Sequence, residues 1–225
     1  MKINLNMAAN NVQKFIGDSL TEKLSRLEHK FRKSNNITAS EFCKENMIST
    51  DLILSSLKLK QLAGQINVII HAVGILTIIP SILEEGEYIE NLSLGAGNTG
   101  RKYDFESNFR IAEFKFINWK GGAEAIRQNS LFKDFYELAE SNTNKRRILY
   151  LIGLDIPLKF LNGKRSLDSV MSKNNKLLND FKAQYGNKFS VVREYYNFRK
   201  SRVELIDLVK ICPTFREITE DVDVE

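Results

Sequence analysis

One segment, residues 110–118, constrains the fold of this chain more than any other. It reads Arg-Ile-Ala-Glu-Phe-Lys-Phe-Ile-Asn, and its wealth of Ile and Phe is typical of a β-strand. Because side chains alternate across a strand, Phe114 and Phe116 share one face, whereas Glu113 and Lys115 share the other. Buried charges cost several kcal/mol each unless they are paired or bind an ion. This pair of charges therefore requires a chemical explanation.

The segment before it carries another carboxylate in a strand pattern. In residues 101–106, Tyr103 and Phe105 share one predicted face and Asp104 lies on the other. A short polar turn joins the two predicted strands, so we expect Asp104 and Glu113 to converge across them. Two carboxylates with a backbone carbonyl and waters make the hard-oxygen site that Mg²⁺ prefers.

The first 60 residues read as helical. Thr38 or Ser40 caps a predicted short helix through Lys44, and Thr50 caps a second one, which is the outline of a helix-turn-helix. The following residues, 61–83, predict a long buried core helix. Its longest apolar run, at 68–83, is shorter than the ~20 residues of a membrane span.

The remaining patterns predict strands alternating with helices, which is typical of an α/β protein. We expect strands at residues 88–94, 101–106, 110–118, 148–153 and 189–192, and helices at 123–140, 166–184 and 202–210.

Asp104, eight residues and then Glu113-Phe114-Lys115 resemble the motif of the PD-(D/E)XK nuclease superfamily, an acid followed by acid-any-lysine on the next strand. The resemblance covers about 100 residues, from the helix before Glu87 to the strand at Ile148, and departs at Tyr103, where the motif has proline. It implies a restriction-endonuclease-like α-β-β-β-α-β core with a mixed central sheet flanked by helices. This core would occupy residues 61–215, with a helical segment at 1–60 and an acidic tail at 216–225.

The resemblance also implies a role for each motif residue. Asp104 and Glu113 would hold Mg²⁺ or Mn²⁺ with the Phe114 carbonyl as a further ligand, and Lys115 would position the attacking water. Members often add an acid from the helix before the first strand, for which we favour Glu84 or Glu85. The implied activity is hydrolysis of phosphodiester bonds in DNA by an endonuclease of restriction, repair or defence type.

The formal net charge of +5 fits a nucleic-acid partner without demanding one. The last nine residues hold five acids and no base, so the rest of the chain is more basic than the total indicates. A homodimer would let two sites address two strands. The polar residues that we expect to contact nucleic acid are Lys102, Lys120, Arg127, Gln128, Lys145, Arg146 and Arg147.

Other interpretations remain open at this stage. Glu113 and Lys115 could be a solvent-facing pair on a half-exposed sheet, and the chain could be a non-catalytic nucleic-acid-binding or regulatory module. The lone His71 is expected to be a hydrogen-bonded core residue. Two distant cysteines and the absence of an apolar N-terminal run favour a cytoplasmic protein without a membrane partner.

Overall fold

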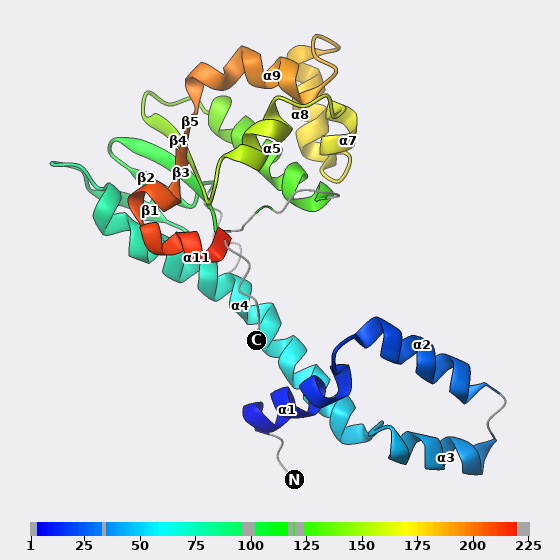
Figure 1. Cartoon of the computed structure of the whole chain (residues 1–225). Helices are drawn as coiled ribbons and strands as arrows, with labels where there is room; N and C mark the ends of the chain where they lie inside the picture. Colours follow the sequence, from blue (N-terminus) through cyan, green and yellow to red (C-terminus); the bar gives the residue numbers. More distant parts are fainter. Residues whose placement is uncertain (1–3, 33–34, 96–101, 117–118, 120–123, 220–225) are drawn as a thin grey trace. The chain divides into compact units, whose positions relative to one another are not determined.

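The computed structural model describes residues 4–32, 35–95, 102–116, 119 and 124–219. The chain divides into two compact units, Met1–Val68 and Ile69–Glu225. The first unit contains α1 (Leu5–Ile16), α2 (Leu20–Phe31), α3 (Asn36–Glu45) and the beginning of α4 (Thr50–Ile82), which continues into the second unit (Figure 1).

The first unit is helical as predicted, but the start of α3 and the length of α4 differ from the prediction. Asn35 caps α3 by accepting from the Thr38 N–H at 3.0 Å. Thr38 is not the cap; its hydroxyl accepts from the Asn35 N–H at 2.9 Å, which completes a capping box. The predicted short helix at Thr50 is in fact the first part of a 33-residue helix.

Residues 69–82 of α4 are mostly apolar on all sides, yet the prediction of a buried core helix is wrong. In the second unit, one stripe formed by Ile75, Ile78, Ile79 and Ile82 is buried, as expected for a helix that lies on a sheet with one face. The other apolar side chains of this part are 42–56% exposed: Ile69, Ile70, Val73 and Leu76. In length and hydropathy α4 also meets the requirements of a membrane-spanning helix, a test that core helices of soluble proteins pass as well.

The second unit is an α/β structure around a five-stranded mixed sheet with the strand order β1-β2-β3-β4-β5. The β1–β2 and β2–β3 pairs are antiparallel, whereas β4 is parallel to both β3 and β5. The succession of a helix, three strands, a helix and a strand from α4 to β4 is the predicted one. The strands are β1 (Ile89–Leu92), β2 (Phe105–Ser107), β3 (Arg110–Lys115), β4 (Arg146–Leu151) and β5 (Glu204–Asp207).

The sheet separates two hydrophobic cores (Figure 1). Phe114 and Phe116 pack against the buried stripe of α4 on one side, and Ile111 packs beneath α5 on the other, so the alternation predicted for β3 is confirmed. Tyr103 and Phe105 contact opposite cores instead of sharing a face, because only the latter belongs to β2. The core that contains Ile111 is built from helices on that side of the sheet: α5 (Ala125–Ala139), α6 (Asp155–Leu161), α7 (Leu167–Met171), α8 (Asn175–Tyr185) and α9 (Val192–Arg199).

Three predictions near the C-terminus are wrong. The helix expected at 166–184 is two helices, because Asn174 caps α8 by accepting from the Leu177 N–H. The strand expected at 189–192 is a single bridge between Ser166 and Val191, after which α9 begins. The centre of the helix expected at 202–210 is instead β5, which pairs with β4, and only the last three residues of that range are α-helical. Short elements follow or flank it: η1 (Lys200–Arg202), α10 (Leu208–Ile211), η2 (Pro213–Phe215) and α11 (Arg216–Thr219).

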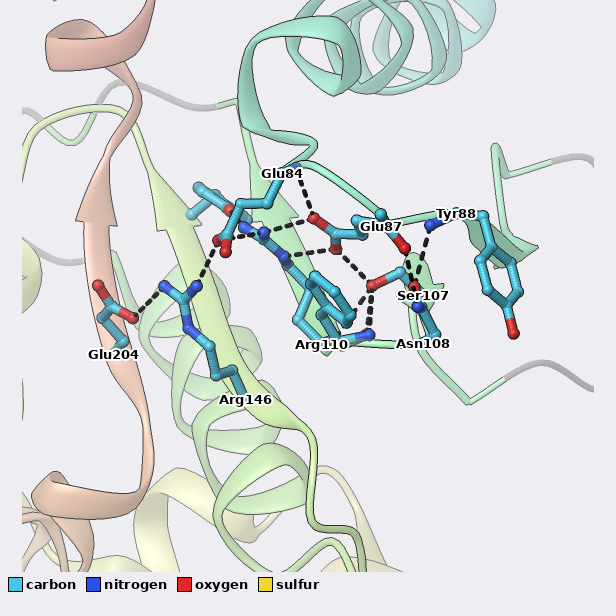
Figure 2. A network of polar contacts seen from close by, with 11 residues as sticks. Glu84, Glu87, Tyr88, Ser107, Asn108, Arg110, Arg146 and Glu204 are labelled. Atoms are coloured by element: carbon cyan, nitrogen blue, oxygen red, sulfur yellow. Dashed lines mark hydrogen bonds and ion pairs between the residues drawn. The ribbon is translucent and has the colours of Figure 1, made fainter.

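The buried guanidinium of Arg110 bonds the beginning of β3 to the segment that follows α4 (Figure 2). The Arg110 side chain is 3% exposed and that of Glu87 is 0% exposed. Arg110 donates to Glu87 through Nε at 2.7 Å and Nη2 at 2.5 Å, and to the Tyr150 hydroxyl at 3.3 Å. Burial alone would raise the pKa of Glu87, but hydrogen bonds from Ser107, the Glu84 backbone and Arg110 outweigh it and lower the pKa.

Replacing Arg110 should therefore destabilise the sheet strongly. Arg110→Leu leaves the Glu87 carboxylate buried without its partner, and we expect a loss of about 3–5 kcal/mol in the free energy of unfolding. Arg146→Leu removes a neighbouring guanidinium whose side chain is 47% exposed, and should cost less than about 1 kcal/mol. Urea denaturation of both variants measures the difference, and equal losses would contradict the role assigned to Arg110.

Candidate functional site

Asp104 and Glu113 face each other at the point where β2 and β3 separate. The ladder pairs Phe105 with Ala112 and Glu106 with Ile111, so the next position along it sets Asp104 opposite Glu113. Asp104 ends the ladder, because its Oδ2 accepts from the Phe114 N–H at 3.0 Å. The two acidic side chains share a hydrogen bond. The convergence expected from the sequence is therefore present.

The second oxygen of Asp104 contacts a histidine from α4. His71 Nε2 lies 3.2 Å from Asp104 Oδ1. The helix approaches the sheet closely here, since a Cβ on Gly74 would lie 2.7 Å from the Phe116 ring. His71 is thus hydrogen-bonded as predicted, but its partner is the site acid, and it is partly exposed, not in the core.

A third carboxylate reaches the site from α5. Asp134, only 4% exposed, forms an ion pair with the Lys115 ammonium. Asp134 is not among the site residues predicted from the sequence. Its signal was an acid within the apolar face of a predicted helix, next to Phe135 and three residues after Leu131, both of which are fully buried.

The buried site shifts the pKa of each of its motif residues. Burial, with the charges of Asp134 and Asp104, raises the pKa of Glu113 to about 10 against the opposing effect of Lys115. Glu113 is therefore protonated at neutral pH and donates to Asp104. Burial alone would also raise the pKa of Asp104, but contacts with His71 and the Phe114 N–H outweigh it and lower the pKa.

Lys115 stays charged in the same surroundings. Burial alone would lower the pKa of its ammonium, but the neighbouring carboxyl groups of Asp134, Glu113 and Asp104 raise it. The site thus places three acidic side chains around one ammonium. Such an excess of acids favours an additional cation.

The acids expected from the end of α4 lie elsewhere. Glu84 accepts from Arg110 and from Arg146, each at 2.5 Å (Figure 2). Arg110 begins β3 and contacts the α4 side of the sheet, so Glu84 does not join Glu113, which lies on the α5 side. Glu85 is exposed. Neither residue is part of the group formed by Asp104, Glu113 and Lys115.

Most of the residues expected to contact nucleic acid have partners within the protein. Lys145 pairs with Glu90 and Glu106, and Arg146 pairs with Glu84 and Glu204, so both are neutralised. The remaining candidates differ in their partners: Lys102 lies over the Tyr103 ring, Arg127 pairs with Glu124, Gln128 accepts from Arg165, and Arg147 bonds to Ser141 and Thr143. Lys120 is outside the described residues.

Two carboxyl groups of this site have the chemistry to hold a hard cation. Asp104, just before β2, and Glu113, in β3, supply carboxyl groups, which is the donor chemistry that Mg²⁺ and Mn²⁺ prefer. Within the part of the chain that the structure describes, no group of three His, Cys, Asp or Glu side chains is arranged around a common point for a metal. The remaining ligands would therefore be backbone carbonyls, waters or substrate oxygens.

Because the pKa of Glu113 is raised in the folded chain, this residue should lower the free energy of unfolding at neutral and alkaline pH. The pKa of Glu113 is about 10 in the folded chain, against 4.5 for an unperturbed carboxyl. Because the unfolded chain loses this proton first, the contribution of Glu113 to the free energy of unfolding is full below about pH 4.5 and is lost as the pH rises toward 10. Glu113→Gln keeps a donor toward Asp104 and removes this loss.

We expect equal melting temperatures for wild type and Glu113→Gln near pH 4.5, and a melting temperature higher by roughly 5 °C for the variant at pH 8. Thermal denaturation in EDTA measures both. A wild type that is the more stable protein at pH 8 would show that Glu113 is ionised in the folded chain.

Comparisons of the chain with known protein families, with curated proteins and with solved structures found no match. The function has to be inferred from the chemistry of the site itself.

Proposed function

We propose that this chain is a metal-dependent nuclease of the PD-(D/E)XK type, which hydrolyses phosphodiester bonds, with DNA as its substrate. One observation carries the proposal: Asp104 lies opposite Glu113 where two strands separate, and Lys115 lies on the same face as Glu113. The mixed sheet and the order of elements from α4 to β4 support it as a restriction-endonuclease-like core.

Each residue of the site has a separate role in the proposed reaction. Asp104 and Glu113 would hold Mg²⁺ or Mn²⁺, which polarises a phosphate and lowers the pKa of a bound water. The Phe114 N–H and His71 each fix one oxygen of Asp104, so its orientation is set before anything binds. The Lys115 ammonium would offset charge that develops on the phosphate.

Asp134 acts on the reaction through Lys115. Its buried carboxylate keeps the ammonium charged and holds it on the α5 side of the sheet. In this arrangement Asp134 is a positioning residue, because it contacts the lysine and not the phosphate.

A non-catalytic binding module is the rival function. It is favoured by the closed state of the site, in which Glu113 shares its proton with Asp104 and Lys115 is paired with Asp134. An inactive protein would keep these pairs permanently, whereas an active one has to exchange them for metal and phosphate.

Cleavage assays on matched variants separate the two functions. The substrates are supercoiled plasmid, linear single- and double-stranded DNA and RNA, each with Mg²⁺, Mn²⁺ or EDTA. We expect Glu113→Ala and Lys115→Ala to lose at least about 100-fold in cleavage rate. Asp134→Asn should lose about tenfold, because Lys115 remains but is less well held.

The control for these variants is Glu106→Gln. Glu106 belongs to the same strand pair as the site, but its carboxylate bonds to Lys145 and Asn91, so this variant should cleave at the wild-type rate. Nucleic-acid binding measured by fluorescence anisotropy should survive in all four variants. Binding without cleavage under every metal, in the wild type as in the variants, would favour the binding module.

Metal binding offers a test that needs no substrate. His71→Leu removes the contact with Asp104, whereas His71→Gln retains a donor. We expect the leucine variant to bind Mn²⁺ about tenfold more weakly and the glutamine variant to stay within about threefold of wild type. Isothermal titration calorimetry measures both, with exposed His29→Leu as the control. Equal Mn²⁺ affinity in all three variants would show that His71 does not contribute to metal binding.

A further inference from the structure

A basic hollow lies at the beginning of β4, beside the short helix η1. Its volume is about 360 Å³, and its lining includes Arg146, Arg147, Lys200, Arg202 and Glu204. Four of these side chains are cations and one is an acid. The acid bonds to Arg146 at 3.1 Å, and Arg146 also bonds to Glu84, so the excess positive charge belongs to the other three.

Two of these cations are held next to each other. Arg147 Nη2 and Arg202 Nη2 donate to the same carbonyl, that of Ser141, at 3.3 Å and 3.4 Å. Burial and then the charge of Arg202 lower the pKa of the Arg147 guanidinium. Like charges at this separation repel each other, and an anion placed between them would relieve the repulsion.

Arg147 is also fixed in one orientation. Its Nε donates to Ser141 Oγ at 2.8 Å, and its Nη2 donates to the Thr143 carbonyl. Within the described residues, the hydrogen bonds of both guanidiniums go to neutral oxygens, and neither forms an ion pair with a carboxylate. Among the described residues, neither Nη1 group has a hydrogen-bond partner, so both can donate to a ligand. A planar fork that is already oriented loses little entropy when it binds.

We infer that this hollow is a phosphate-binding site formed by Arg147, Arg202 and Lys200. Guanidinium forks match the oxygens of a phosphate in pairs, and an exposed ammonium adds a point charge. The register sets Arg147 beside Ile111, whereas Lys115 lies beside Leu151. The hollow is therefore about 13 Å along β4 from the level of Lys115, and it is distinct from the proposed catalytic site.

Phosphate at this position has two sources, a nucleic-acid backbone or a free oligophosphate. The probes are therefore pyrophosphate and a short DNA duplex, each titrated by calorimetry at constant ionic strength. Arg202→Gln and Lys200→Gln are the test variants, because Arg202 makes only one long hydrogen bond among the described residues and Lys200 is exposed. Lys188→Gln is the matched control, since Lys188 is an exposed cation over the Phe198 ring, outside the hollow.

We expect saturable pyrophosphate binding by the wild type and by Lys188→Gln, weakened at least about tenfold in Arg202→Gln and in Lys200→Gln. A parallel loss of duplex affinity assigns the site to a nucleic-acid backbone, and an unchanged duplex affinity assigns it to a free oligophosphate. Glu113→Ala should bind pyrophosphate like the wild type, so failure of the nuclease proposal leaves this result intact. Absent pyrophosphate binding, or binding that Arg202→Gln and Lys200→Gln do not weaken, overturns the inference.

Discussion

Buried charge on one central strand determines how the second unit is built. Strand β3 places Arg110 toward α4 and both Glu113 and Lys115 toward α5, in the middle of two hydrophobic cores. Each of these charges would be costly alone. The surrounding chain contributes partners accordingly: the segment between α4 and β1 supplies Glu87, α5 supplies Asp134 and the residue just before β2 supplies Asp104.

The two faces satisfy their charges differently. On the α4 face, Arg110 is surrounded by acceptors and Glu87 keeps a lowered pKa, so this network is complete as it stands. On the α5 face, three acidic side chains surround Lys115 alone, and Glu113 stays neutral by retaining a proton. A complete network stabilises a fold, whereas an unbalanced one is typical of a site that awaits a ligand. Within a single strand, the charge on the α4 side is therefore fully paired, whereas on the α5 side the acids outnumber the one ammonium.

Local patterns predicted the centre of the sheet well and its surroundings poorly. The alternation in β3 and the turn after Ser107 were enough to bring Asp104 toward Glu113, because a strand pair fixes its register over a few residues. His71 lies 33 residues before Asp104, and no local pattern connects the two. The error in α4 has a related cause: composition reports that a helix is apolar, but not how much of its surface another element covers. The region of β5 was misread because a four-residue strand beside short helices has too few residues to show its period.

Gly74 sets how closely α4 approaches the sheet, and the contact between His71 and Asp104 depends on that distance. The absence of a side chain lets α4 rest against the Phe116 ring, and His71 reaches Asp104 from the preceding turn of the same helix. A single methyl group at position 74 would lift this part of α4 by a fraction of an ångström to avoid the ring. Such a shift is small for the hydrophobic contacts of the neighbouring isoleucines, yet a hydrogen bond of 3.2 Å has little room to lengthen. Gly74 thereby acts as a spacer for an electrostatic contact in which it takes no part.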